Sequence, residues 1–170
     1  MLTRHVITEA YRLRRVRVTD AAMPLVVRRV KVQDLSVLES LEGETVRSFP
    51  ARSRWMETYR SLLERALTEE PEGLLVADFD GRAIGAAIAR VRGTHPVTGE
   101  EHGRLEALTV APAWRAHGIR ERLIKEAEAY LKSRGCRLMV TTLRTDAGAE
   151  GDLYKTTGFK VAAWELERAL

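Results

Sequence analysis

The stretch "LTVAPAWRAHGIRERLI", residues 108–124, joins the end of an apolar strand to the start of an amphipathic helix. The turn between them leaves backbone N–H groups without intrahelical partners beside the positive end of the helix dipole, which favours anion binding. Arg115 and Gly118 stand where an Arg-x-x-Gly-x-Gly loop would place them, whereas Arg120 replaces the last small residue. Because one glycine between a strand and a helix is common, the stretch taken alone also fits a purely structural turn.

The segments around this stretch predict an α/β (α+β) fold with helices on both faces of one mixed sheet. Strands are expected at 25–32, 104–112 and 136–143, a hairpin about Asp80-Gly81 within 74–91, a polar loop at 93–103, and a last strand or tight pair of strands at 159–170. Helices are expected at 34–43, with Asp34 or Ser36 as N-cap and Gly43 past its end, and at 52–70, 118–135 and 146–158. An antiparallel meander followed by strand–helix–strand makes the sheet mostly antiparallel with one parallel pair.

The strand before the turn has an irregular apolar pattern. Leu105 and Leu108 are three residues apart, but Leu108 and Val110 are two apart. No undisturbed strand of period 2 points all three side chains to one face, whereas a one-residue β-bulge does. The pattern therefore predicts a bulge, with Glu106 beside it.

Composition excludes several classes of protein. The chain has 170 residues, 45% of them hydrophobic, which suits one globular domain, expected at 23–170. It has no apolar run near the roughly 20 residues that span a bilayer and no apolar core of a signal peptide, so a cytoplasmic location without membrane contact is expected. A lone Cys136 gives no internal disulfide and no zinc cluster, and is expected to be a buried thiol; no metal is predicted.

The charge is basic but modest, with 28 Lys and Arg against 24 Asp and Glu. Residues 1–22, which contain "RLRRVRV", are expected to form a basic N-terminal extension outside the domain. Acidic residues are spread through the rest of the chain and no aromatic–basic surface motif is present. These features argue against nucleic acid as the partner.

Two motifs together resemble the GNAT superfamily of acyl-CoA-dependent N-acyltransferases. The first is L-x-V-x-P-x-x-R-x-x-G-I at 108–119, and the second is L-Y-x-x-x-G-F at 153–159. The resemblance covers about residues 24–166 and implies acetyl-CoA (coenzyme A) as cosubstrate. It implies that the pantetheine arm pairs with the backbone of Leu108, Thr109 and Val110, and that the pyrophosphate is held by backbone amides of Arg115, Ala116, His117, Gly118, Ile119 and Arg120. The side chains of Leu108 and Val110 are expected to belong to the core.

The resemblance also implies catalytic residues. Tyr154 matches the family's general acid, because a phenol is protonated at neutral pH and can donate to a departing thiolate. Glu106 is the first candidate for the general base, with His102 and a water relay behind it. The alternatives are a Tyr154 that only packs its ring on Phe159 with its hydroxyl in water, and a Glu106 that is a surface carboxylate.

The function expected from these residues is transfer of an acetyl group from acetyl-CoA to a primary amine of an unidentified small molecule, peptide or protein. The alternative is a catalytically silent acyl-CoA-binding regulatory module on the same fold. The chain departs from the family at Ala147 and Glu150, where Asn and Ala are frequent, and its C-terminal end is short. The acceptor side could therefore be open, or be completed by the N-terminal extension or by a second subunit of a homodimer. Arg120 could obstruct the cofactor or bind a phosphate.

Overall fold

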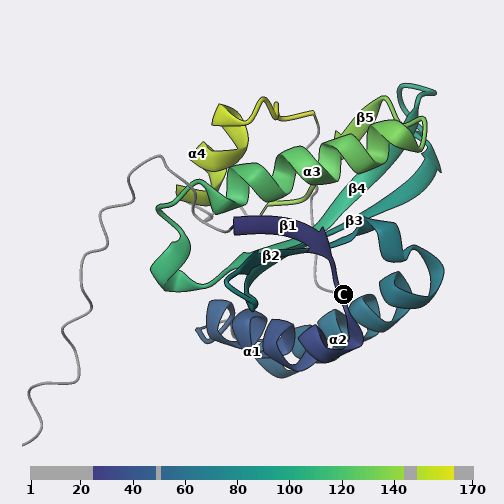
Figure 1. The fold of residues 1–170 in the computed structure, drawn as a ribbon. Helices are drawn as coiled ribbons and strands as arrows, with labels where there is room; N and C mark the ends of the chain where they lie inside the picture. The colour runs from purple at the N-terminus through teal and green to yellow at the C-terminus, as the bar shows by residue number, and fades with distance from the viewer. Residues whose placement is uncertain (1–24, 49–50, 144–148, 163–170) are drawn as a thin grey trace, which may run out of the picture.

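The computed structural model describes residues 25–48, 51–143 and 149–162 (Figure 1). Its strands are β1 (Leu25–Arg29), β2 (Leu74–Phe79), β3 (Arg82–Thr94), β4 (Glu101–Val110) and β5 (Leu138–Val140). Its α-helices are α1 (Leu35–Thr45), α2 (Arg52–Glu69), α3 (Ile119–Ser133) and α4 (Ala149–Thr156), with short 3-10 turns η1 (Val32–Asp34), η2 (Pro71–Gly73) and η3 (Pro112–Trp114). The predicted N-terminal extension, residues 1–22, lies outside this part of the chain.

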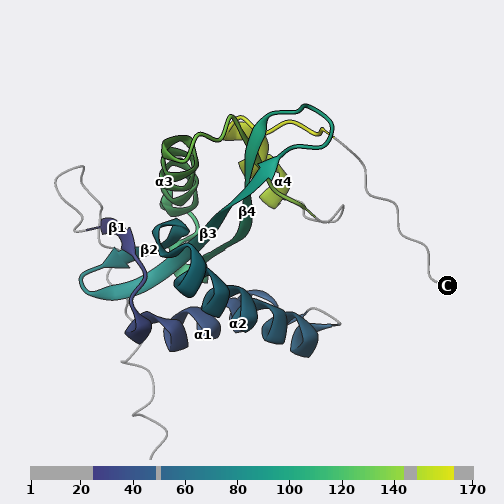
Figure 2. The ribbon, with the colours of Figure 1, turned by 90° about the vertical axis from the view of Figure 1, so that its right-hand side faces the viewer.

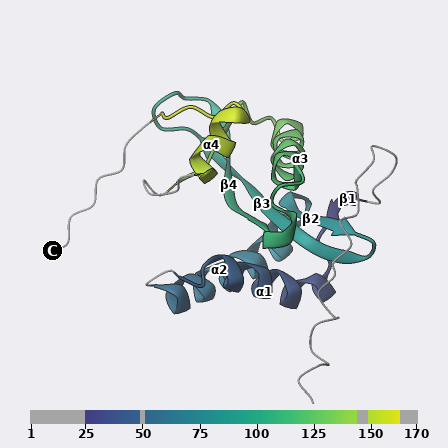
Figure 3. The same cartoon turned by 90° about the vertical axis from the view of Figure 1, so that its left-hand side faces the viewer.

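The five strands form one sheet in the order β1-β2-β3-β4-β5. Neighbouring strands are antiparallel from β1 to β4, and β4 and β5 are parallel. Helices α1 and α2 cover one face, whereas α3 and α4 lie on the other (Figures 2 and 3). Each face buries its own hydrophobic cluster, one beneath α3 and α4 and one beneath α1 and α2. The predicted fold class is confirmed.

The hairpin between β2 and β3 turns where the sequence predicts it. Asp80 has φ 51° and Gly81 has φ 77°, so both central residues adopt the left-handed region. A two-residue turn of this kind matches the twist of the paired strands. The next hairpin differs from the prediction, because β3 continues to Thr94 and β4 begins at Glu101, which shortens the polar loop to six residues, 95–100.

Helix α1 begins and ends differently from the prediction. Gly43 does not terminate it but lies buried inside it, and the helix continues to Thr45. A Cβ at Gly43 would lie 3.3 Å from Arg52 Nη2, so the glycine permits the close approach of α2. Asp34 precedes the helix but makes no side-chain cap to it. Its carboxylate accepts instead from the Lys31 N–H at 2.7 Å and from the Arg28 guanidinium, and this pairing lowers the pKa of Asp34.

The C-terminal part of the sheet is smaller than predicted. The expected buried strand at 136–143 is reduced to the three half-buried residues of β5. Cys136 is buried, as expected, and burial raises the pKa of its thiol. The described part of the predicted last strand, residues 159–162, is not a strand, and residues 163–170 lie outside the described part of the chain. None of the helices described here is long and apolar enough to cross a membrane.

Candidate functional site

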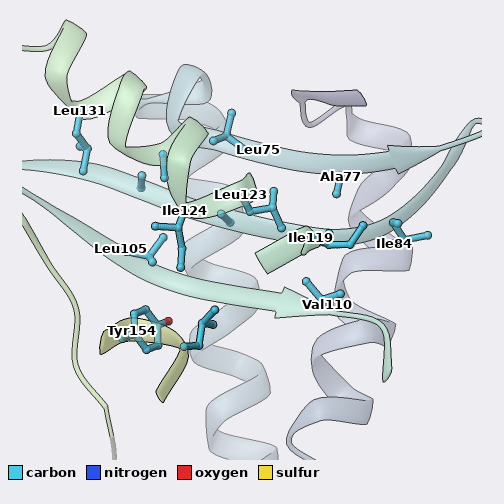
Figure 4. Packing of buried hydrophobic residues seen from close by; sticks show 14 of the residues in the cluster. Leu75, Ala77, Ile84, Leu105, Val110, Ile119, Leu123, Ile124, Leu131 and Tyr154 are labelled. Carbon is cyan, nitrogen blue, oxygen red and sulfur yellow. The ribbon is translucent and has the colours of Figure 1, made fainter. Parts of the chain in front are cut away.

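The predicted irregularity in β4 is a β-bulge at Glu106. On β3, the adjacent residues Ile88 and Ala89 pair with Ala107 and Leu105, so Glu106 is an extra residue with no partner opposite it. The bulge lets Leu105 and Val110 both enter the cluster beneath α3, with Leu108 packed against it (Figure 4). The sequence prediction of a bulge here is confirmed.

Immediately before the bulge, β4 and β5 separate. Their last paired residues are Arg104 and Val140, after which no strand among the described residues pairs with β4 on that side. The Thr141 hydroxyl donates to the Leu105 carbonyl at 3.0 Å, immediately beyond the last pair. The rest of β4, residues 106–110, therefore presents a free strand edge that an extended ligand could pair with.

The turn after β4 leads into α3 with several unpaired N–H groups. Gly118 precedes the helix with φ 69°, a left-handed conformation that favours glycine. Five backbone amides between residues 116 and 121 donate to no backbone carbonyl in the described part of the chain. They belong to Ala116, Gly118, Ile119, Arg120 and Glu121. A Cβ built at Gly118 would meet nothing within 4 Å. These turn amides form an open, positively polarised end of α3.

The side chains of the turn hold it against the sheet. Trp114 packs on Phe79 of β2 with ring centroids 4.6 Å apart, and on the exposed His117 at 5.4 Å. The Arg115 Nε donates to the Val110 carbonyl at 3.2 Å, and its Nη2 donates to Thr45 Oγ1 at 3.3 Å. Arg115 therefore links the end of β4 to the end of α1 while staying exposed to solvent.

Arg120 differs from its neighbours in this turn. Its side chain is half-buried, and its Nε is buried without a hydrogen-bond partner among the residues that the structure describes. A buried N–H without an acceptor costs about 1–3 kcal/mol.

Tyr154 lies on α4, which contacts the same face of the sheet as α3. Its side chain is buried and belongs to one cluster with Leu105 and Leu153 (Figure 4). Its ring packs edge-on against Phe159 at 5.2 Å. The packing of the Tyr154 ring on Phe159 is thus present, as expected if Tyr154 had only a structural role. The side chain, however, lies inside the core and not at the surface.

Glu106 is not a solvated surface carboxylate, because its side chain is only 13% exposed. Arg92 of β3 forms an ion pair with its Oε1, and the Arg104 Nε lies 3.8 Å from its Oε2. His102, the second candidate base, lines the same shallow pocket as Glu106, and its Nδ1 lies 2.7 Å from the Gly93 carbonyl oxygen. The structure thus brings the two predicted bases together in one pocket.

A buried polar network lies on the opposite side of β4 from α3, under α1 and α2. Glu42 of α1 is 5% exposed and accepts hydrogen bonds from the Trp55 indole at 2.7 Å and from the Thr109 hydroxyl. Burial, and secondly the Glu42 charge, raise the pKa of Tyr59. The network fixes α1 and α2 to the strand that carries the predicted cofactor edge.

Sequence reasoning missed Arg92, Arg104 and Glu42 as parts of this region. The spacing of Arg104 and Glu106 could have predicted their contact, because residues two apart in a strand point to the same face. Arg92 and Glu42 gave no such signal, since both reach β4 only through pairing that is distant in the sequence. Among the described residues, no group of three or more His, Cys, Asp or Glu could hold a metal ion.

Comparison with known proteins places this geometry in context. Residues 36–159 match the model of the acetyltransferase (GNAT) family. An uncharacterized N-acetyltransferase of Methanocaldococcus jannaschii is 23% identical over 138 residues, which are 79% of this chain and 60% of that protein. The chain thus spans less than two thirds of the length of that relative.

Solved structures share the fold at low sequence identity. An aminoglycoside N-acetyltransferase in complex with CoA superposes with a TM-score of 0.71 at 20% identity, over 86% of this chain and 94% of that one. A GCN5-related N-acetyltransferase from Ralstonia eutropha gives 0.70 at 19% identity, over 86% and 98%. At such identities the likeness concerns the fold.

Proposed function

This chain belongs to the acetyltransferase (GNAT) family, and from that premise we propose that it transfers an acetyl group from acetyl-CoA to a primary amine. One observation carries the proposal: the bulge at Glu106, the free edge of β4 and the unpaired turn amides follow one another along a single strand and turn. A long ligand could bind along them, with an extended arm paired to the free strand edge and a pyrophosphate at the turn amides.

The residues present fit coenzyme A. The backbone of Leu108, Thr109 and Val110 would pair with the pantetheine arm, because it forms the free strand edge. The pyrophosphate would accept from backbone amides of the turn at 115–120, where four of the six are unpaired, and from the buried Arg120 Nε. Bound there, the cofactor supplies the activated acetyl thioester.

The protein's own groups would handle the protons. An alkylammonium with a pKa of about 10.4 is not a nucleophile, so Glu106 would accept its proton, directly or through water. As the new C–N bond forms and the C–S bond breaks, the thiolate leaves, and Tyr154 would donate the proton that it needs. Glu106 lies on the bulge, next to the point in β4 where the strands separate, and Tyr154, on α4, shares a hydrophobic cluster with Leu105.

The glycine of the turn provides a test of cofactor binding. Gly118→Ala is expected to weaken acetyl-CoA binding at least about tenfold, because a side chain in the left-handed region costs about 1–2 kcal/mol and shifts the turn amides. Isothermal titration calorimetry measures the change. Gly81→Ala is the matched control, because Gly81 also has positive φ and open space around its Cβ but lies in the β2–β3 hairpin. It should lose similar stability yet bind acetyl-CoA normally; equal binding by both variants would contradict the assignment of the turn.

A second test concerns Arg120. Arg120→Ala is expected to weaken acetyl-CoA binding about tenfold, because its unpartnered Nε would lose a charge-assisted hydrogen bond to phosphate. Arg122→Ala, at an exposed position of the same helix, should leave the dissociation constant unchanged. Tighter binding by Arg120→Ala would mean that the side chain obstructs the cofactor.

A further inference from the structure

A shallow pocket of about 470 Å³ opens at the bulge, toward the far end of the β3–β4 hairpin. Its lining consists of Arg92, Thr94, Pro96, His102, Arg104 and Glu106. In Figure 2 this hairpin continues past α1 and α2, which leaves its end uncovered by these helices. A volume of this size is sufficient for a small molecule.

The charged side chains of this pocket differ in how far they are exposed to solvent. Glu106 lies at its base with a 13% exposed side chain, whereas Arg92 and Arg104 are each 40% exposed. Arg92 contacts Glu106 through Nη2, and Arg104 contacts Glu106 through Nε and Thr142 through Nη2. Among the described residues, the other N–H groups of both guanidinium groups have no hydrogen-bond partner, and both side chains are partly exposed in the lining of the pocket.

We infer that the acceptor is a small amino acid-like zwitterion, whose carboxylate binds Arg92 and Arg104 while its amine lies at Glu106. This inference rests on the proposed function, since it assigns the acceptor of that same site. Guanidinium groups bind carboxylates with paired, charge-assisted hydrogen bonds. They repel a second positive charge, so an acceptor with several amines and no acidic group is disfavoured.

A second carboxylate, that of Glu101, does not remove this preference. Glu101 accepts a hydrogen bond at 2.7 Å from the hydroxyl of Thr94, which lines the pocket. Its carboxylate is exposed, so solvent screens it, whereas Arg92 and Arg104 line the pocket itself. The His102 ring packs edge-on against His95, with ring centroids 5.0 Å apart.

The competing explanation is that both arginines only orient Glu106. In that case their removal would affect every amine alike. Binding of the acceptor carboxylate instead predicts a differential effect, in which acids lose affinity and matched amides do not. The comparison of acid with amide therefore separates the two roles.

The experiment titrates each common amino acid and its carboxamide into the protein, with and without CoA, and measures dissociation constants by calorimetry or NMR. At least one amino acid is expected to bind about tenfold more tightly than its amide. Arg92→Gln and Arg104→Gln should each reduce this ratio toward one, whereas Arg122→Gln, exposed on α3, should preserve it.

Three results would overturn the inference: amides that bind as well as acids, a preference that survives in both arginine variants, or no binding by any amino acid. These outcomes are distinct from failure of the proposed function. Acetyl transfer to amines without a carboxylate preference would leave the function standing, and a carboxylate preference without any transfer would leave only the binding pocket.

Discussion

Tyr154→Phe is expected to slow acetyl transfer by about 100-fold or more while leaving the dissociation constant of acetyl-CoA within about twofold. Proton donation by a positioned side chain contributes roughly 10²–10⁴-fold to a rate, and phenylalanine has no proton to give. The ring itself is retained, so the edge-on packing on Phe159 and the place in the cluster beneath α3 and α4 should persist. Steady-state release of thiol from acetyl-CoA measures the rate, and calorimetry measures the binding.

Tyr130→Phe is the matched control for this prediction. The Tyr130 hydroxyl donates to Glu70, a residue outside the predicted site that also accepts from the Val91 N–H. Loss of this hydrogen bond should lower the free energy of unfolding by about 1 kcal/mol without changing the rate of acetyl transfer. A Tyr154→Phe protein as active as the wild type would show that the thiolate takes its proton from another donor.

Glu106→Gln is expected to reduce kcat by about 100-fold at neutral pH, because an amide cannot accept the proton of the acceptor ammonium. Glutamine keeps the size of the side chain, so the bulge at this position, opposite Ile88 and Ala89, should be retained. Rates with a fixed amine acceptor, together with acetyl-CoA binding, separate loss of catalysis from loss of cofactor.

The control for Glu106 lies on α3. Glu128 is an exposed carboxylate that pairs with Lys132, so Glu128→Gln removes an equal charge without touching the pocket. It should leave kcat unchanged. Full activity in Glu106→Gln would instead assign proton removal to His102 or to water, since His102 lines the same pocket.

The features that the sequence predicts well are those set by neighbours along the chain. The spacing of Leu105, Leu108 and Val110 is enough to place the bulge, because side chains alternate strictly along a strand. The Asp80-Gly81 turn follows from the need for two left-handed residues in a short hairpin.

The features that it misses depend on distant contacts. Gly43 reads as a helix end, but α2 packs against it, so the glycine serves close contact between helices. The surroundings of Glu106 depend on Arg92, which reaches it only because β3 pairs with β4. Glu42 likewise acquires its role from Thr109, 67 residues away. Pattern along a chain carries little information about such pairings.

An acceptor screen with purified protein tests acetyl transfer itself. Acetyl-CoA is supplied with individual amines, and thiol release is followed together with the mass of the amine product. At least one amine is expected to gain an acetyl group, with one thiol released for each acetyl transferred, and both signals are expected to be lost in Tyr154→Phe. Tight binding of acetyl-CoA with no transfer to any amine would contradict the proposed transfer and indicate a silent acyl-CoA-binding module, and no binding of acetyl-CoA would contradict both.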